Sequence, residues 1–518
     1  MNGAQALIQT LVDAGVDVCF MNPGTSEMHF VAALDDVHAM RGVLALQENV
    51  ATGAADGYAR MAEKPASVLL HLGPGLGNGL ANLHNARKGQ VPIVNIVGDH
   101  ATYHKQYDAQ LESDIETVAR NVSPWIRWGT TPDQVGTDAA EAVAASMTAP
   151  RNVATLILPA DTSWLDGGVP AAPIAPAAPA AVSADTVAAV AAALASGEPT
   201  AILLGGTTLL EPGLIAASRV AATTGAKLLA ETFPARMTRG AGVPAPERIA
   251  YLAEFAMSQL DGLKHLVLVD AKAPVSFFAY PDKASYLVPD GCEVHVLASP
   301  ADDAVGALLA LADAVGAAPD AAVLQPAARS ERPTGPLTAE SLCQAFGAML
   351  PDDAIVSDEG NTTGLFAGMF SAGAPRHDWL CLTGGAIGQG LPVATGAAVA
   401  CPDRPVVCLA SDGSSLYTLQ ALWTQAREGL DVTTVVCNNR SYAVLNMELG
   451  RVGAEVAGPK AKEMLDLSQP DIDFVALATG LGVPASRAET ADELCAQLEK
   501  AFAEPGPHLI EAIVPPMF

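Results

Sequence analysis

The sequence predicts an α/β protein made of three consecutive doubly wound domains, each built on a parallel sheet. Short apolar runs alternate with helix-like segments along the chain, which is the pattern of right-handed βαβ crossovers. Two Ala/Pro-rich stretches interrupt this alternation, at residues 167–184 and 316–336, and each proline there removes a backbone donor that a helix needs. A length of 518 residues is enough for about three or four domains of ~150 residues. The domains are therefore expected at residues 1–166, 185–315 and 337–518.

The expected elements of the first block alternate from its start. They are helix 3–14, strand 17–20, helix 27–36, strand 42–46, helix 49–62, strand 66–71, a Gly-rich loop, helix 78–88 and strand 92–97. The second block repeats the rhythm, with strands near 200–204, 226–230, 265–270 and 293–297. The third block has strands expected at 353–357, 404–410, 432–437 and 508–514.

Charge and composition exclude several classes of partner. The chain has 28 Lys+Arg against 56 Asp+Glu, a formal net charge of −28, so it repels phosphate backbones and anionic lipid. Its eight cysteines are scattered without a C-x-x-C pair, which is typical of reduced core thiols. The first residues lack the pattern of a signal peptide, and no long uncharged apolar segment predicts a membrane span. We expect a cytoplasmic protein with no nucleic-acid and no membrane partner.

A candidate metal site lies where two strands of the third block end. The strand Val406–Ala410 runs into Asp412, and the next strand ends just before Asn439, 27 positions later. Parallel strands joined by a helix end at the same sheet edge, so these two side chains can converge. With the backbone carbonyl of Ser441 they offer only oxygen ligands, which suits Mg²⁺.

The same edge favours a diphosphate. A helix is expected to begin after Gly413, so free backbone N–H groups around Gly413 and Ser414 face the metal ligands. Each motif also has a purely structural explanation: Asp412 could be a helix N-cap, and Asn438-Asn439 could form a turn. Their coincidence at two strand ends favours the metal-diphosphate site.

This arrangement resembles the cofactor signature of thiamine-diphosphate (ThDP) enzymes. The family has Asp-Gly at a strand end and Asn-Asn 26 to 27 positions later; it usually has Gly before the Asp, where this chain has Ser411. Serine is tolerated there if its φ is negative. The resemblance implies that the three blocks are a pyrimidine-binding, a central and a diphosphate-binding domain, with ThDP and Mg²⁺ as cofactors.

The family requires a glutamate from the pyrimidine-binding domain, and Glu48 is at the matching position, between a strand and a helix. Hydrogen-bonded to the aminopyrimidine ring, such a carboxyl favours the tautomer that deprotonates the cofactor's reactive carbon. An isolated glutamate there would otherwise be a first-turn residue favoured by the helix dipole. The neighbouring segments 22–27 and 71–78 resemble the benzoylformate decarboxylase and acetolactate synthase branch.

Further residues match the family motifs. Asn361 and Thr362 match positions that hold the diphosphate, and Gly385 matches the carbonyl that meets the aminopyrimidine. Ile387 matches the side chain wedged between the cofactor rings, although core packing would explain it equally well. The resemblance further implies substrate contacts for two residues of the first block, His71 and Thr25; His100 and His104 are weaker candidates.

Two departures from the family argue against its best-known substrates. In the central block, the position of the decarboxylase's second active-site histidine corresponds to Ala279, which disfavours benzoylformate. Acetolactate synthases have Asp-Ala-Phe-Gln-Glu where this chain has Asp-Ala-Gln-Leu-Glu at 108–112, which disfavours true acetolactate synthesis.

Three rival readings remain. The loop Gly73–Gly77 imitates a dinucleotide fingerprint, but Asn78 stands where the pattern needs glycine. The central block could hold FAD, as in pyruvate oxidase and acetolactate synthase, yet Leu203–Gly206 is a generic strand-to-turn junction. A catalytically silent partner subunit would have no chemical need to keep Glu48, Asp412 and Asn439 together.

The sequence thus predicts an acetolactate synthase-like enzyme that decarboxylates a 2-oxo acid, ligates the product to a second carbonyl, or both: a lyase or transferase. The resemblance implies that each cofactor lies between the first block of one subunit and the third block of another. A homodimer is then the minimum assembly, and a homotetramer is expected.

Overall fold

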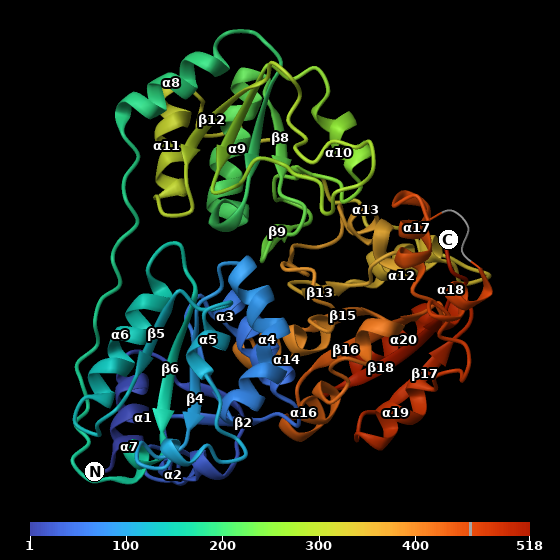
Figure 1. Ribbon diagram of the computed structural model, residues 1–518. Coiled ribbons are helices and arrows are strands. Elements are labelled where there is room, and N and C mark those ends of the chain that lie inside the picture. Colours follow the sequence, from blue (N-terminus) through green and yellow to red (C-terminus); the bar gives the residue numbers. More distant parts are fainter. Residues whose placement is uncertain (455–457, 518) are drawn as a thin grey trace.

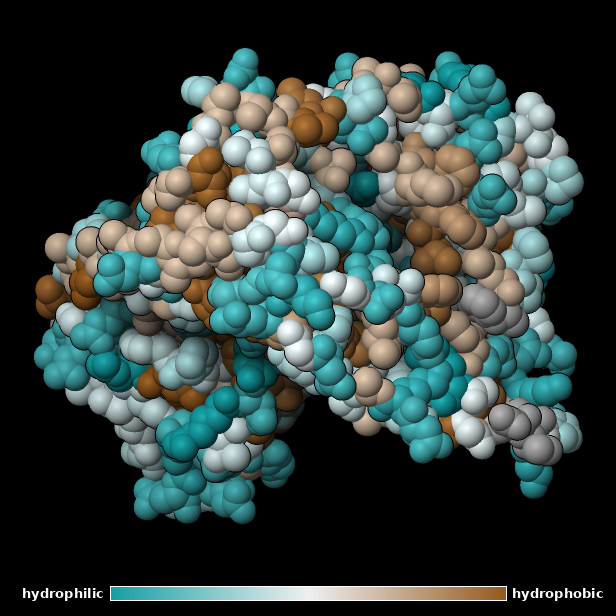
Figure 2. All heavy atoms as spheres, turned by 90° about the horizontal axis from the view of Figure 1, so that it is seen from above, coloured by the Kyte–Doolittle hydropathy of each residue, from teal (hydrophilic) through white to brown (hydrophobic). Residues whose placement is uncertain are grey.

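The computed structural model describes residues 1–454 and 458–517 and contains three α/β sheets (Figure 1). The predicted fold class is confirmed. No helix of the described residues is both long and apolar enough to span a membrane. Seen from above, the molecule shows hydrophilic side chains spread among hydrophobic ones (Figure 2).

The first sheet has six parallel strands in the order β2-β1-β3-β4-β6-β5. Its strands are β1 (Val18–Asn22), β2 (Arg41–Leu44), β3 (Ala66–Leu70), β4 (Ile93–Asp99), β5 (Trp125–Trp128) and β6 (Val153–Pro159). Its helices are α1 (Gly3–Asp13), α2 (Met28–Ala33), α3 (Glu48–Ala62), α4 (Leu72–Lys88), α5 (Ile115–Ala119), α6 (Val135–Met147) and α7 (Ala160–Trp164). A long extended segment then runs along the outside of this part to α8 (Figure 1).

The central sheet has five parallel strands in the order β10-β8-β7-β11-β12. They are β7 (Thr200–Leu204), β8 (Lys227–Ala230), β10 (Glu247–Arg248), β11 (His265–Val269) and β12 (Glu293–Ala298). The helices are α8 (Ala184–Leu194), α9 (Glu211–Thr224), α10 (Ala253–Leu260) and α11 (Ala304–Ala314). The four predicted strands are all present.

The third sheet has seven strands in the order β17-β18-β16-β15-β13-β14-β9. Its parallel strands are β13 (Ile355–Glu359), β14 (His377–Cys381), β15 (Val406–Ser411), β16 (Val432–Asn438), β17 (Ala485–Ala488) and β18 (His508–Ile513). Its helices are α12 (Ala339–Met349), α13 (Ala367–Phe370), α14 (Gly390–Ala400), α15 (Asp412–Ser415), α16 (Ala421–Glu428), α17 (Ala443–Arg451), α18 (Pro459–Glu463), α19 (Phe474–Gly480) and α20 (Ala491–Ala503).

The last strand of this sheet comes from the central block. β9 (Met237–Arg239) pairs antiparallel with β14, with Met237 opposite Trp379. The second and third predicted blocks are therefore interleaved at this edge, because a segment of the second completes the sheet of the third.

The first and third blocks share one hydrophobic core. α3 packs on α14 so closely that a Cβ on Gly57 would collide with the backbone of Val393, and one on Gly396 with the backbone of Ala54. Glycine is required at both positions because the two helix backbones touch. The core cluster runs without a break from Val50 on α3 through α14 to strands of both sheets.

Two local expectations were wrong. The Gly-rich segment predicted as a loop before residue 78 forms the first turns of α4, and a Cβ on Gly73 would collide with Ser113, so this glycine serves close packing rather than a loop. The helix expected after Gly413 is also interrupted, because α15 ends at Ser415 and α16 begins at Ala421.

Candidate active site

At the carboxyl edge of the first sheet, His71 is held by a buried carboxylate. β1 and β3 are neighbours, so the segment that follows β1 lies beside His71, which follows β3. The Nδ1 atom of His71 lies 2.8 Å from Oε2 of Glu27, whose residue is 1% exposed. Because an ionised carboxylate only accepts hydrogen bonds, Nδ1 carries the proton and Nε2 remains available to a substrate.

The carboxylate of Glu27 is itself fixed from several sides. It accepts hydrogen bonds from the backbone N–H of Gly24 and the hydroxyl of Ser26, at 2.7 and 2.6 Å. A Cβ on Gly24 would collide with the ring of His71, so glycine is needed for this approach. Sequence reasoning quoted this segment as a motif but missed Glu27 as a functional residue; the signal was a carboxylate next to a strand end.

The structure brings Ser26 to His71, whereas Thr25 is exposed. Ser26 Oγ lies 3.3 Å from His71 Nδ1, and Thr25 begins the short 3-10 turn that follows β1. His100 and His104 pack against each other, with ring centroids 5.3 Å apart.

Glu48 is the first residue of α3, one position earlier than the helix was expected to begin, and it does not cap that helix. The side chain of Gln47 does so, by accepting from the backbone N–H groups of Asn49 and Val50. The carboxylate of Glu48 instead accepts a hydrogen bond from Asn78 Nδ2 at 3.1 Å, and the residue is 9% exposed. A side chain of α4 therefore holds this carboxylate. A glutamate present only because the helix dipole favours an acidic residue in the first turn would not need this contact.

The predicted metal ligands meet at the carboxyl edge of the third sheet. Asp412 is 2% exposed; its Oδ2 accepts from the backbone N–H of Arg440 at 2.7 Å and its Oδ1 from that of Gly413 at 2.8 Å. Oδ1 of Asn439 accepts from the backbone N–H of Ser441 at 2.9 Å. Asp412 and the segment Asn439–Ser441 thus converge, as the two adjacent strand ends require.

This edge suits a cation. Burial raises the pKa of the Asp412 carboxyl, and within residues 1–454 and 458–517 no side chain forms an ion pair with it. A buried carboxylate without a cationic side chain is costly unless a bound cation neutralises it. Oxygen-only donors of this kind fit Mg²⁺. Asn439 and Ser441 also line a crevice of about 550 Å³ that opens beside them.

Residues expected at the diphosphate lie on the same edge. Ser411 has φ −80°, so its replacement of the family's usual glycine causes no backbone strain. Its hydroxyl donates to the carbonyl of Glu359 and accepts from Asn361 Nδ2, both at 3.1 Å. Thr362 follows Asn361 directly. Gly413 lies so close to Tyr442 that a Cβ there would collide with the tyrosine ring, so glycine is needed at this position. Ser414 is buried in α15, whose N-terminus faces this edge.

The loop that carries Gly385 and Ile387 is clamped from two sides. Asn85 on α4 donates to the carbonyl of Ala386, and Asn82 on the same helix donates to that of Gly388. From the other side, Glu359 accepts from the backbone N–H groups of Gly388 and Gly390 at 2.7 and 2.8 Å, and burial raises the pKa of its carboxyl to about 7. Ile387 is half-buried, and Gly385 has φ +74°, which favours glycine.

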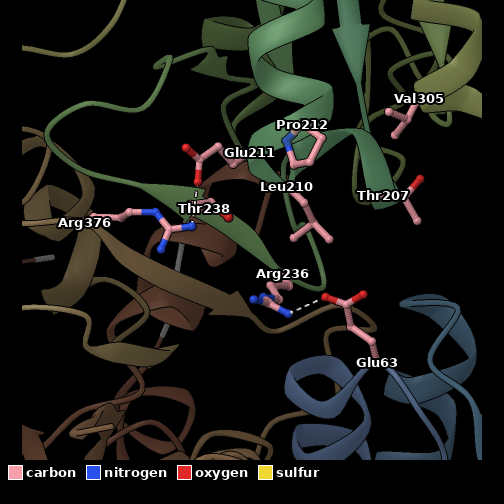
Figure 3. A pocket seen from close by; sticks show the side chains of 9 residues that line it. All are labelled: Glu63, Thr207, Leu210, Glu211, Pro212, Arg236, Thr238, Val305 and Arg376. Carbon is pink, nitrogen blue, oxygen red and sulfur yellow. Dashed lines mark hydrogen bonds and ion pairs between the residues drawn. The ribbon is translucent and has the colours of Figure 1, made fainter. Parts of the chain in front are cut away.

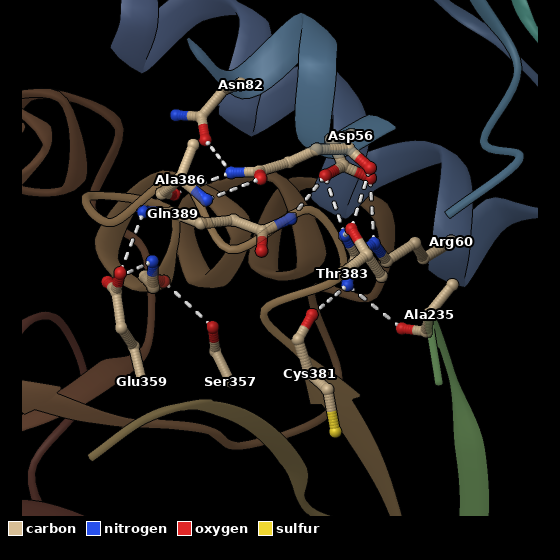
Figure 4. Close-up of polar contacts among 12 residues, drawn as sticks. Asp56, Arg60, Asn82, Ala235, Ser357, Glu359, Cys381, Thr383, Ala386 and Gln389 are labelled. Atoms are coloured by element: carbon tan, nitrogen blue, oxygen red, sulfur yellow. Dashed lines mark hydrogen bonds and ion pairs between the residues drawn. The ribbon is translucent and has the colours of Figure 1, made fainter. Parts of the chain in front are cut away.

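A buried ion pair ties this loop to the first block (Figure 4). Arg60 binds Asp56 through two hydrogen bonds of 2.7 Å, with both side chains at most 1% exposed. Arg60 further donates to the carbonyls of Cys381 and Ala235, and Gln389 donates to Asp56. The network joins segments of all three predicted blocks.

An aromatic cluster of the central block covers the same loop. Phe233, Tyr251, Phe277 and Phe278 pack ring against ring, with centroids 4.9–6.2 Å apart. A Cβ on Gly385 would lie 2.7 Å from Cζ of Phe277. Ala279, at the position of the decarboxylases' second histidine, is exposed beside these rings.

A separate crevice of about 420 Å³ lies between the central block and the other two (Figure 3). Arg236, Arg376, Glu63 and Glu211 line it, and they pair with one another as Arg236–Glu63 and Arg376–Glu211. None of the predicted site residues lines it, so it is not the candidate active site.

Comparisons with known proteins identify the family. The family model described as "Thiamine pyrophosphate enzyme, N-terminal TPP binding domain" matches residues 1–119, and its C-terminal counterpart matches residues 358–512. The chain is 61% identical over 516 residues, 99% of both chains, to "Putative acetolactate synthase large subunit IlvX" of Mycobacterium tuberculosis. The chain belongs to the thiamine pyrophosphate enzyme family.

More distant relatives cover the whole chain as well. Benzoylformate decarboxylase of Pseudomonas aeruginosa is 29% identical over 527 residues, 96% of both chains. The thiamine diphosphate-dependent 4-hydroxybenzoylformate decarboxylase of Rhodococcus jostii RHA1 superposes with a TM-score of 0.85 at 23% identity, covering 99% of both chains, which confirms the fold. The predicted family and its acetolactate synthase and benzoylformate decarboxylase branch are confirmed.

Proposed function

We propose that this family member is a ThDP- and Mg²⁺-dependent enzyme acting on 2-oxo acids, as a decarboxylase, a carboligase or both. The observation that carries the proposal is the meeting of Asp412 with the segment Asn439–Ser441. It supports a Mg²⁺ held by the Asp412 carboxylate, the Asn439 side-chain oxygen and the Ser441 carbonyl, beside the N-terminus of α15. Gly413, Ser414, Asn361 and Thr362 are then placed to hold the cofactor's diphosphate.

When bound, ThDP would supply a nucleophilic carbon for the keto carbon of the substrate and a thiazolium ring as the acceptor of the electron pair released when CO₂ leaves. In the proposal, Glu48 holds a proton at the aminopyrimidine ring, an assignment supported by its buried position and its hydrogen bond from Asn78. Gly385 would offer its carbonyl to that ring, and Ile387 would pack between the two rings of the cofactor.

His71 handles the substrate in this scheme. Its Nδ1–H is bound to Glu27, so Nε2 can accept a proton from the substrate or return one to the product. Thr25 is exposed beside it and can contact the substrate carboxylate, while Ser26 supports the His71–Glu27 pair.

We further propose that the active site forms between two subunits. Glu48 and Asp412 have separate surroundings in one chain, since Glu48 contacts α4 whereas Asp412 contacts the backbone after β16. The family resemblance pairs the first block of one subunit with the third block of another, so we expect a homodimer or homotetramer.

The substrate is expected to carry an apolar group. The aromatic cluster of Phe277 and its neighbours lies against Gly385, and Ala279 offers no second histidine to help with proton transfer. Acetolactate synthesis proper is the second candidate, favoured by the 61% identity to a protein of that name. The departure at residues 108–112 argues against it.

A flavin in the central block is disfavoured by charge. The loop after β7 would be the natural phosphate cradle, but Gly206 N–H already donates to Glu231 at 3.0 Å and Thr207 N–H to Asp270 at 2.8 Å. A flavin diphosphate would therefore meet two carboxylates at this edge. Yellow colour in the purified protein would contradict this inference.

One experiment tests the proposal. The protein, supplied with ThDP and Mg²⁺, is assayed for CO₂ release from a panel of aliphatic and aromatic 2-oxo acids, with and without an added aldehyde acceptor. CO₂ release that needs both cofactors, or a ligated product with aldehyde, supports the enzyme. Acetolactate from pyruvate alone would favour the second candidate, and ThDP retention without turnover of any acid would favour a silent partner subunit.

A further inference from the structure

A second cluster of ligand side chains lies at the amino-terminal edge of the central sheet, away from the elements that carry Glu48 and Asp412. His265 begins β11 and Glu293 begins β12, and the two are paired directly in the parallel register. Residues two apart on a strand face the same side, so His295 points to the same face as Glu293. This face carries Val267 and Leu297 of the core under α8 and α11. The sheet itself therefore gathers two imidazoles and a carboxylate.

The three ligand atoms form a triangle with one short side, between the two imidazole nitrogens. His265 Nδ1 lies 3.0 Å from His295 Nε2, and Glu293 Oε2 lies 3.8 and 3.9 Å from these two nitrogens. The point equidistant from all three atoms lies about 2.1 Å from each. Zinc bonds to imidazole nitrogen and carboxylate oxygen have lengths of about 2.0–2.2 Å. An ion therefore fits between these atoms with little movement of the side chains.

A fourth side chain sets the state of His265. Its Nε2 atom lies 3.0 Å from Oε2 of Glu198, which lies between α8 and β7. A carboxylate accepts hydrogen bonds, so Nε2 carries the proton and Nδ1 presents its lone pair to His295 and Glu293. An outer carboxylate that fixes ring and tautomer in this way is the usual support of a metal-binding histidine.

Burial distinguishes this cluster from a chance group of surface residues. The side chains of His265 and His295 are 12% and 16% exposed, so both rings are held in place, whereas that of Glu293 is 68% exposed and leaves the site open to solvent. Two imidazoles with one carboxylate suit a borderline ion such as Zn²⁺ rather than Mg²⁺ or Ca²⁺, which take oxygen ligands.

We propose that His265, His295 and Glu293 bind one Zn²⁺-class divalent ion, with Glu198 as the support of His265 and water as the fourth ligand. The ion ties β11 to β12, the edge strand of the central sheet. It is independent of the Mg²⁺ proposed at Asp412, because the two sets of ligands belong to different sheets.

The test uses the full-length protein in excess Mg²⁺ and ThDP, stripped of transition metals and titrated with ZnCl₂. We expect one Zn²⁺ per chain after desalting, measured by mass spectrometry, and a higher Tm. His295→Gln and His265→Gln should lose both effects, and Glu198→Gln should weaken binding about 10–100-fold. His508→Gln is the matched control, because His508 pairs with a single carboxylate, Glu504, at 3.4 Å and should change nothing.

Circular dichroism of each variant without zinc separates loss of the site from loss of the fold. The proposal is wrong if wild-type protein retains no Zn²⁺, or if folded His295→Gln retains as much as wild type. Equal losses in His295→Gln and His508→Gln would identify nonspecific binding to surface histidines and would also overturn it.

Discussion

Nδ1 of His71 lies 2.8 Å from Oε2 of Glu27, and the two residues follow neighbouring strands of the first sheet. The carboxylate is buried while the imidazole is partly open, with 24% of its side chain exposed. Because Glu27 accepts the hydrogen bond of Nδ1, it fixes the tautomer and orientation of the His71 ring. Nε2 of His71 is then directed to exchange a proton with the substrate.

Glu27→Gln should therefore reduce kcat by ~10²-fold or more, at the lower end of the ~10²–10⁴-fold range of acid–base assistance, with a smaller change in KM. The amide can present either its oxygen or its N–H to Nδ1, so the ring is no longer held in one tautomer. Turnover and the ¹⁵N signals of the His71 ring check this. A variant with wild-type kcat and an unchanged tautomer would show that Glu27 serves only packing.

Glu48→Gln should retain ThDP but lower turnover by ~10²-fold or more, because an amide cannot hold the proton at the aminopyrimidine. Cofactor content and CO₂ release are the measurements. Glu63→Gln, at the opposite end of α3, is the control and should leave both unchanged. Undiminished turnover in Glu48→Gln would remove this residue from the mechanism.

Asp412→Ala should abolish Mg²⁺-dependent retention of ThDP, because Asp412 is the charged side chain among the three proposed protein ligands, Asp412, Asn439 and Ser441. Retention is measured by desalting and cofactor assay with and without EDTA. Asp403→Ala, in the exposed turn before β15, should behave as wild type. Normal retention in Asp412→Ala would place the metal elsewhere.

Arg60→Met should lower the free energy of unfolding by about 3–5 kcal/mol, because it leaves Asp56 buried without its cation. Denaturant unfolding of wild type and variant measures the difference. Arg332→Met breaks an exposed pair with Glu499 and should have little effect. Equal stability of Arg60→Met and wild type would mean that Gln389 and solvent suffice to satisfy Asp56.

The contribution of Glu231 to the stability of the protein should fall as the pH rises from about 4.5 to about 7. Burial, with the nearby charge of Asp270, raises the pKa of Glu231 from 4.5 to about 7. In this window the folded protein binds more protons than the unfolded chain, so the free energy of unfolding decreases with pH; above it, this contribution is constant. Glu231→Gln should show a smaller fall in Tm between pH 5 and 8. An identical fall would assign the effect to other groups.

The strand ends that carry the candidate site could be predicted from the sequence, and the reason is local. Val406–Ser411 is largely apolar, Val432–Asn438 is rich in β-branched residues, and each is followed by turn-forming residues, so the positions of Asp412 and Asn439 at one sheet edge follow from the parallel topology. Ser411 is the last residue of β15 and has an extended conformation, so it has the negative φ that a serine at this position requires.

Other features had no local signal. The three residues of β9 are too few to show a strand pattern, and their pairing with β14 depends on a segment about 140 positions away. The glycines at the start of α4 are typical of a loop, but contacts such as Gly73 with Ser113 are visible only in three dimensions. The role of Glu27 could not be predicted because its partner, His71, is 44 positions away in the sequence.

The crossing of β9 into the sheet of the third block limits how the chain can be divided. A fragment that begins after residue 316 would keep β13 beside β14 but lose β9, which would leave the other edge of β14 open to strands of other molecules. Such a fragment should self-associate, and adding the peptide 232–242 in trans should suppress this. The third sheet is therefore expected to need residues of the central block for its own protection against aggregation.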